Sequence, residues 1–405
     1  MVSTPQFSGL TTRLAGPARL LAARLGQIAR PAHTHAPPPM PDRPGAVLRG
    51  RLHVPIRPVP SEAALWEGIV AEWSAIAAAE RWADLLAALR RADQARAGAP
   101  GGRRLAGLIS LGARHPLTAT LTRRDWPAAE AEIDRLAAVQ SAHPEDYVAA
   151  HLLAQAHLDY GWARRSAEPG PGLPREVWQA FLHHTALAEA VLEPFDPIEE
   201  MSPLLAGTRY LLVRGIEDGD AMCRDWYEDW SDLDPTNPEP HSTHAVHLLP
   251  HWFGSLGSFD DEARAAMKRT RHCSGASAYA MFYLAATDSL GDLPLRVDLA
   301  LFLQGLTDFY QATGCQYRAN IVAGALTELD HSLSLDAAKG SRRRQLVSEV
   351  LAAHLRENLR EFHLSAWDNG EAGIQYALGQ AFATELARGE HVYVGPEGLT
   401  THLPT

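Results

Sequence analysis

Three histidines, His244, His247 and His251, occupy positions i, i+3 and i+7 of one short segment of this 405-residue chain. In an α-helix, residues at this spacing share one face, and His241 lies further round the same face. Neutral imidazoles arranged in this way are typical ligands of zinc and other divalent metals, particularly with a carboxylate from a neighbouring helix. One candidate function is therefore a metal-dependent hydrolase in which this face holds an ion that activates water.

Two features of the same segment count against a metal site. Pro250 should bend or end the helix just before His251, because proline cannot donate the helical hydrogen bond. The sequence also lacks the HExxH motif, in which two histidines on one helix face bind zinc. We therefore favour packed or hydrogen-bonded histidines, and we expect no cofactor, no bound metal and no catalytic residues.

Aromatic residues flank the histidines on both sides and suggest a binding surface instead. Aromatic rings bury large areas and are enriched at binding hot spots. The candidate partner-binding residues are Trp226, Trp230, His244, His247, His251 and Trp252. Core packing between helices is the favoured alternative for the tryptophans, because this residue type is highly buried on average. The acidic residues between Asp225 and Asp234 could bind a basic peptide or a divalent cation, but such runs are more often a solvated helix face.

These side chains require two antiparallel helices, and the surrounding sequence predicts them. Residues 218–230 and 241–249 have helical patterns, and the elbow between them, residues 234–240, is rich in proline and asparagine, which favour turns. Residues 126–142 and 147–160 repeat the arrangement, with Pro144 in the elbow and Gly161 closing the second helix. Further helices are expected at residues 61–76, 82–96, 175–192, 204–216, 260–271, 277–289, 295–313, 317–331, 342–362 and 371–387.

The predicted fold class is all-α, an irregular right-handed stack of antiparallel helical hairpins that forms an α-solenoid. The helical repeat domain is expected to span residues 61–390. A flexible, basic and Pro/His-rich leader and linker precedes it at residues 1–60, and residues 391–405 form an extended C-terminal tail.

The charge and the cysteines exclude several functional classes. A formal net charge of −11 disfavours nucleic-acid binding, which requires a basic surface. The three cysteines are widely spaced, so neither a disulfide framework nor a zinc ribbon is indicated and a reducing compartment fits. No stretch is long and apolar enough for a membrane-spanning helix, and no secretion signal is evident. We expect a cytoplasmic protein.

The N-terminal segment differs from the rest in charge. Residues 1–41 contain four arginines and no acidic residue, and residues 7–30 include an apolar stripe at helical spacing. A basic amphipathic helix docks on anionic lipid, so a membrane-surface adaptor that makes weak contact through residues 7–30 is another candidate function. A loosely ordered leader is the favoured interpretation.

The repeated elbows resemble those of tetratricopeptide-repeat proteins. Residues 143–161 are similar to the inter-helix proline, second helix and closing glycine of such a repeat, and residues 234–238 are similar to its usual junction. Residues 160–165 and 249–255 further resemble an uncharacterised bacterial family of tetratricopeptide-like domains. The resemblance implies a noncatalytic protein-interaction or scaffolding module that binds a protein or peptide partner, and it carries over no catalytic residues.

Overall fold

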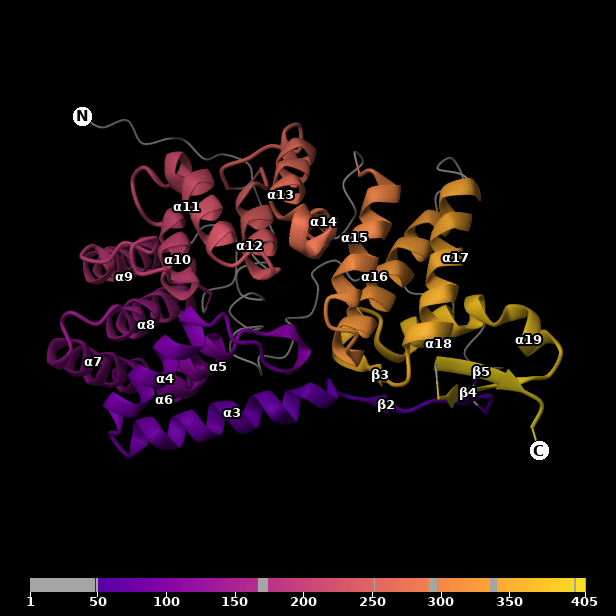
Figure 1. Cartoon of the computed structure of the whole chain (residues 1–405), viewed down its shortest axis with the longest axis horizontal. Coiled ribbons are helices and arrows are strands. Elements are labelled where there is room, and N and C mark those ends of the chain that lie inside the picture. The colour runs from indigo at the N-terminus through magenta and orange to yellow at the C-terminus, as the bar shows by residue number, and fades with distance from the viewer. Residues whose placement is uncertain are drawn as a thin grey trace. The chain divides into compact units, whose positions relative to one another are not determined.

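The computed structural model describes residues 48, 50–166, 174–250, 252–290, 297–335, 341–396 and 398–404. Within these ranges most residues are helical and strands are few, which confirms the expected helical class (Figure 1). Residues 7–30, the candidate membrane-surface segment, and His251 lie outside the described residues. None of the helices in the described ranges is both long and apolar enough to cross a lipid bilayer.

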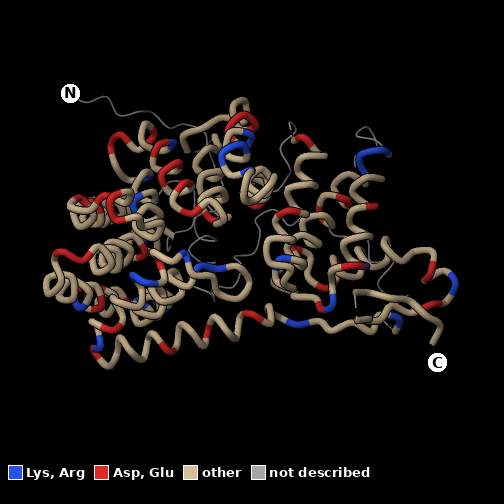
Figure 2. The backbone as a smooth tube through the Cα atoms, in the orientation of Figure 1, with Lys and Arg blue, Asp and Glu red and all other residues tan. Residues whose placement is uncertain are grey.

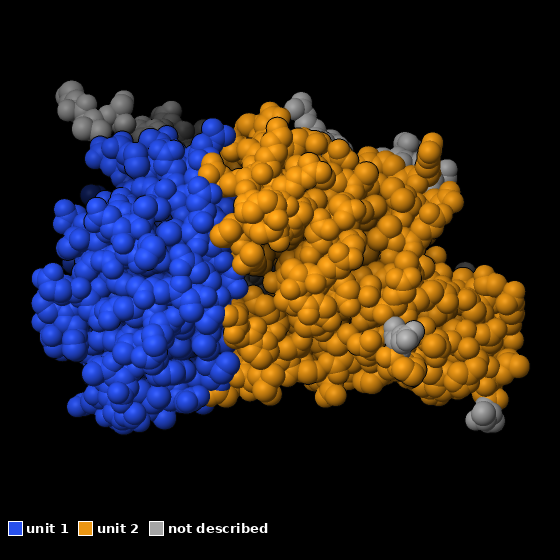
Figure 3. Space-filling view, in the orientation of Figure 1, with its two compact units in different colours: residues 1–34, 69–97, 104–234 blue, residues 35–68, 98–103, 235–405 orange. Residues whose placement is uncertain are grey.

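The chain forms two compact units (Figure 3). Unit 1 contains the described residues of 69–97 and 104–234, and unit 2 contains those of 48–68, 98–103 and 235–404. Helix α3, Ser61–Ala78, begins in unit 2 and ends in unit 1.

Unit 1 contains the end of α3 and, in the rest of its described part, further helices. In chain order they are α4 (Trp82–Gln94), α5 (Leu105–Ala113), α6 (His115–Arg123), α7 (Trp126–Ala142), α8 (Tyr147–Ser166), α9 (Arg175–Leu192), α10 (Pro203–Tyr210), the 3-10 helix η2 (Leu211–Arg214) and α11 (Gly219–Leu233). Local signals set several starts. Asp125 caps α7 by accepting from the Ala128 amide, and Ser202 caps α10 by accepting from the Leu205 amide.

Helix α8 is the centre of unit 1. Every residue from Tyr147 to Trp162 is buried, and α7 and α9 pack against it. Its alanines allow neighbouring helices to approach closely. The helix does not close at Gly161 as expected, but continues to Ser166. A glycine inside a helix costs about 1 kcal/mol relative to alanine. Packing against α9 outweighs this cost, and includes an edge-on contact of Trp162 with Phe181, with ring centroids 4.7 Å apart.

A buried polar seam joins α8 to its neighbours. The Nε2 atom of His151 lies 2.7 Å from the Ser110 hydroxyl on α5, and its Nδ1 atom lies 2.7 Å from the Thr208 hydroxyl on α10. Buried polar groups that are satisfied in this way fix the register of packed helices, because any shift would leave them unpaired.

Farther along α8, the seam contains an ion pair. The Asp159 carboxylate accepts from the Arg114 guanidinium between α5 and α6, and from the side-chain amide of Gln155 at 2.9 Å. Both charged side chains are less than one-tenth exposed. Burial removes water from both charges, so only the ion pair and its hydrogen bonds compensate for the lost hydration.

Unit 2 combines helices with short strands. Its elements are β1 (Leu52–His53), β2 (Ile56–Arg57), the start of α3, η1 (Pro100–Gly102), α12 (Glu239–His247), α13 (Phe259–Ser274), α14 (Ser277–Leu290), α15 (Leu299–Gln311), α16 (Gln316–Leu335), α17 (Ser341–Asn358), β3 (Phe362–His363), η3 (Leu364–Ala366), α18 (Gly370–Ala381), α19 (Ala383–Ala387), β4 (His391–Gly395) and β5 (Gly398–His402).

The strands of unit 2 join its N-terminal residues 52–57 to residues near its C-terminal end. Strands β1, β4 and β5 form a sheet in that order, with β1 parallel to β4 and β4 antiparallel to β5. Strand β2 pairs with β3 in parallel. Residues 52–57 fall in the segment expected to be a linker, and β3 begins at Phe362, the last residue of the helix expected at 342–362. Both differences arise because the hydrogen bonds join residues that are far apart in sequence.

Candidate functional site

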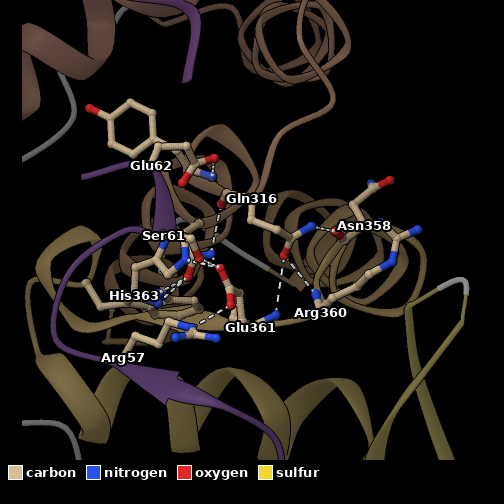
Figure 4. Close-up of polar contacts among 11 residues, drawn as sticks. Arg57, Ser61, Glu62, Gln316, Asn358, Arg360, Glu361 and His363 are labelled. Carbon is tan, nitrogen blue, oxygen red and sulfur yellow. Dashed lines mark hydrogen bonds and ion pairs between the residues drawn. The ribbon is translucent and has the colours of Figure 1, made fainter. Parts of the chain in front are cut away.

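The acidic side chain of Glu361, just before β3, collects three donors from different elements (Figure 4). Its Oε2 atom accepts from Arg57 Nε of β2 at 2.6 Å, and its Oε1 atom accepts from the Ser61 hydroxyl at the start of α3. His363 Nε2, from β3, lies 2.9 Å from the same Oε1 atom. We call Arg57, Ser61, Glu361 and His363 the Glu361 junction.

The electrostatics of the junction favour an ionised carboxylate. Partial burial alone would raise the pKa of Glu361, but hydrogen bonds from Ser61, His363 and Arg57 outweigh it and hold the pKa below its usual value. His363 is fully buried, and its backbone amide donates to the Asn320 side chain at 2.8 Å. The junction is therefore a charged cluster of unit 2 in which His363 is buried, Glu361 is partly buried, and Arg57 and Ser61 are exposed.

The residue types could suggest nucleophilic catalysis, but the connectivity does not. In a catalytic triad the histidine lies between the hydroxyl nucleophile and the acid, so that it can take the hydroxyl proton. Here the carboxylate is the central group, and Ser61 and His363 both contact its Oε1 atom. This arrangement positions the segments that carry the four residues and does not activate the Ser61 hydroxyl.

Two side chains of α16 hold the segment that carries Glu361. Gln316 Oε1 accepts from the backbone amides of Arg360 and Glu361 at 2.8 and 3.3 Å. Asn320 Nδ2 donates to the Glu361 carbonyl at 2.9 Å, and its Oδ1 atom also accepts from the Trp367 indole at 3.0 Å. The carboxylate is thus fixed from both its side chain and its backbone.

Replacing Asn320 with alanine should lower the free energy of unfolding by about 2–3 kcal/mol, since the buried His363 amide and Trp367 indole would lose their acceptor. Chemical denaturation followed by tryptophan fluorescence measures this. Gln304→Ala is the matched control, because Gln304 is exposed and bonds only Asp308 through its side chain in the described structure. It should change stability by less than about 0.5 kcal/mol. Equal effects of the two variants on stability would contradict this role of Asn320.

The start of α3 is anchored on its buried side. Glu62 accepts from the Tyr317 amide at 3.2 Å, and Trp66 donates its indole N–H to the Pro100 carbonyl at 2.7 Å. Gly101 has a φ of 75°, and a Cβ there would lie 2.7 Å from the Trp66 ring, so this turn requires glycine. The Arg103 guanidinium covers the same indole at 4.0 Å.

A hollow of about 680 Å³ lies at the C-terminal end of α17. It is lined by Arg356, Glu357, Arg360, Pro396, Gly398 and Thr400. Its two arginines already have acceptors: Arg356 bonds Glu385 at 2.7 Å, and Arg360 Nε bonds the Pro396 carbonyl at 3.2 Å. We assign no ligand to this hollow.

Three of the histidines singled out in the sequence, His241, His244 and His247, are buried in α12. Each of them is at most 2% exposed, and burial lowers the pKa of His241 to about 4. His244 lies edge-on to Phe282, with ring centroids 5.9 Å apart. This is the packed arrangement favoured above. Within the described ranges, no group of three or more His, Cys, Asp or Glu side chains is placed to hold a metal ion.

The tryptophans of the predicted partner surface belong to different units. Trp226 and Trp230 lie in unit 1, whereas Trp252 lies in unit 2. Trp230 is 3% exposed and packs beside Tyr210, while Trp226 is half-buried beneath the Arg209 guanidinium at 4.8 Å. Trp252 is half-buried near Phe253. A role of these residues in partner binding stays a prediction.

Comparisons with protein-family models, with curated proteins and with solved structures find no match to this chain.

Proposed function

We propose that this chain is a noncatalytic protein-interaction or scaffolding module of tetratricopeptide-like type, and that its partner docks on residues 56–68 of unit 2. The observation that carries the proposal is the exposure of three large apolar side chains within ten residues. Ile56, Val59 and Leu65 are 39%, 52% and 55% exposed. Clustered apolar exposure of this kind is typical of surfaces that a partner covers.

The first turns of α3 support the same proposal. Ala64, Leu65 and Gly68 are exposed, whereas Trp66 is buried, so apolar residues lie on the solvent-facing side of the helix as well as on its buried side. An apolar partner on the exposed side would bury them.

The segment is also held rigidly enough to present a preformed surface. The Glu361 junction fixes Arg57 and Ser61, and the contacts of Glu62 and Trp66 fix the next turn. Binding to an ordered surface costs less conformational entropy than binding to a mobile one. The junction therefore serves as the support of the docking surface.

Charge indicates the chemistry of the partner. Between Arg57 and Arg81 the sequence contains four glutamates and no lysine or arginine. Figure 2 shows acidic residues and no basic ones along α3. Glu67 is exposed on the proposed surface, so the partner that fits is a peptide or helix with apolar and basic side chains.

A photo-activated cross-linker placed at residue 65 should capture this partner in cells, whereas the same group at residue 403 should not. Leu403 is the matched control, because it is also exposed but lies outside the proposed surface. With the purified partner, Leu65→Asp should weaken binding at least tenfold, because it places a carboxylate in an apolar contact, whereas Leu403→Asp should change it less than twofold.

Three results would count against this docking surface. Equal capture at the two positions, or wild-type affinity of Leu65→Asp, would contradict the assignment of the surface. Cross-links from residue 65 to residues 7–30 of the same chain, or to a second copy, would show that the chain itself covers this surface and that no external partner is needed.

A further inference from the structure

The segment that precedes α10 in unit 1 exposes two large apolar side chains. Ile198 and Met201 are 49% and 59% exposed. The amides of Ile198 and Glu199 donate to Asp196 Oδ1 at 2.8 and 3.2 Å. The Met201 carbonyl accepts from the Arg96 guanidinium at 3.3 Å. The two apolar side chains are therefore presented to solvent by a turn whose backbone is held in place.

Carboxylates of α11 lie beside this turn. Arg209 of α10 links the two, because its guanidinium lies 3.7 Å from the Asp196 carboxylate and 4.8 Å from the Trp226 ring of α11. Partial burial raises the pKa of Asp229, and Arg209 opposes this shift. The negative charges of Asp196 and Asp225 raise the same pKa further. The turn and α11 therefore share one region of negative potential.

This region holds most of the negative charge of the chain. Residues 193–232 contain eleven acidic residues and three arginines, a net charge of −8, compared with −11 for all 405 residues. Glu199 of the turn and Asp225 of α11 are both exposed. Exposed apolar side chains among charges of one sign favour an apolar partner of the opposite charge. We call Ile198, Glu199, Met201, Asp225 and Trp226 the α11 surface.

We propose that residues 7–30 of the same chain dock on the α11 surface. The apolar stripe of this segment lies against Ile198 and Met201, and its arginines face the carboxylates. The stripe consists of Leu14, Ala18, Leu21, Leu25 and Ile28. Residues 1–41 contain four arginines and no acidic residue, so the segment complements the surface in charge and in apolar character.

Charge favours the α11 surface over the docking surface proposed for the external partner. Residues 56–68 contain two glutamates and one arginine, a net charge of −1, so they attract the basic segment far less than residues 193–232 do. The contact with α11 uses none of residues 56–68. It therefore does not depend on the partner proposed above.

The connecting chain is long enough for this contact. The seventeen residues 31–47 separate the segment from Leu48, the first described residue. They span about 56–61 Å when fully extended, whereas a folded unit of about 150 residues has a radius of gyration of roughly 15 Å. The connection therefore does not confine the segment to unit 2, which contains Leu48. Since both parts belong to one chain, their effective concentration is about millimolar and a weak contact is sufficient.

The experiment places a photo-activated cross-linking amino acid at position 21, within the apolar stripe, in the purified full-length protein without lipid. A mixture of unlabelled and isotope-labelled protein separates cross-links within one chain from those between two copies, and mass spectrometry locates them. The expected result is a product within one chain that joins position 21 to residues 193–201 or to α11.

A charge swap tests the electrostatic part of the contact. Arg19→Glu combined with Arg24→Glu should lower the yield of this product about tenfold, because like charges then face each other. Adding Glu199→Arg and Asp225→Arg should restore the yield to within about twofold of the original value, because the charges are again opposite.

Reversal of two exposed acidic residues of α3 is the matched control for this rescue. Combined with Arg19→Glu and Arg24→Glu, the substitutions Glu67→Arg and Glu72→Arg should leave the yield low, because both glutamates lie outside the α11 surface. Restoration by this pair would place the segment on α3 and contradict the proposal.

The apolar part of the contact has its own variants. Ile198→Asn combined with Met201→Asn should lower the yield about fivefold, because the contact then buries less apolar area. Asparagine also tolerates the positive φ of 47° at position 201. Leu182→Asn combined with Leu187→Asn is the control, since these leucines of α9 are 37% and 36% exposed in the same unit, and it should leave the yield unchanged. Circular dichroism should show that all variants remain folded, because each changes only exposed side chains.

Two further outcomes would overturn the proposal. Products that join position 21 only to a second copy or to α3 would place the segment elsewhere. A position 21 that forms no product within the chain, but reacts when phosphatidylserine vesicles are added, would make anionic lipid the ligand of residues 7–30. The location of the cross-links in the unsubstituted surface provides a test that does not depend on how well the variants fold.

Discussion

Replacing Asp159 with alanine is expected to lower the free energy of unfolding by about 3–5 kcal/mol, the usual cost of removing one partner of a buried ion pair. The Asp159 carboxylate, on the buried helix α8, accepts hydrogen bonds from Arg114, between α5 and α6, and from Gln155 of α8. Without it, a guanidinium that is less than one-tenth exposed loses its carboxylate. Chemical denaturation, followed by circular dichroism, measures the change directly.

Two further variants distinguish loss of this pair from a general effect of removing an aspartate. Asp84→Ala breaks the Arg81–Asp84 pair, in which both side chains are 60% exposed, and should change stability by less than about 1 kcal/mol. Asp159→Leu combined with Arg114→Met should be more stable than Asp159→Ala, because neither charge then remains buried. If the double variant were the least stable of the three, the ion-pair explanation would be wrong.

Acidification should destabilise unit 1 through the pair of histidines His157 and His184. Their Nδ1 atoms lie 3.0 Å apart between α8 and α9. Burial, and then neighbouring histidines including His183, lower the pKa of each to about 4, from the usual 6.5. The unfolded chain therefore takes up these protons at a higher pH than the native protein does. Stability is complete above pH 6.5 and is lost as the pH falls from 6.5 towards 4.

The size of this effect can be measured with one substitution. For His157, which is 8% exposed, the loss between pH 7 and pH 4.5 should be about 2 kcal/mol. His157→Gln should therefore show a shallower decrease than the wild type over this range, whereas His115→Gln, at an exposed position, should not. Parallel pH profiles of the wild type and His157→Gln would show that the buried ring does not control acid sensitivity.

The helices could be predicted because their signals are local. Residues 126–142 and 175–192 were expected as helices and form α7 and α9 with the same bounds. Gly161 is a position where local signals gave a wrong prediction, because α8 continues to Ser166. A glycine at the end of an apolar pattern is a common helix terminator, but here the contacts of Trp162 with α9 extend the helix past it. Only the packed structure reveals those contacts.

The Glu361 junction could not be predicted, because its members are distant in sequence and ordinary in type. Arg57 and Ser61 lie 304 and 300 residues before Glu361. No spacing rule relates positions so far apart, and strands β2 and β3 have only two residues each, which leaves no alternating pattern to detect. The histidines of α12 had the opposite property: their spacing is clear in the sequence, but it reflects burial among core rings.

The long-range strand pairing of unit 2 sets an order of events on the ribosome. Residues 69–97 and 104–234, which make up the described part of unit 1, are synthesised well before β3 and β4 appear. At about 5–20 residues per second, His391 emerges roughly 17–70 s after His53, which lies 338 residues earlier. Until β3 and β4 emerge, β2 and β1 respectively have no partner strands. Unit 2 therefore completes its fold late, and chaperones that bind apolar segments have a long opportunity to hold this part of the chain.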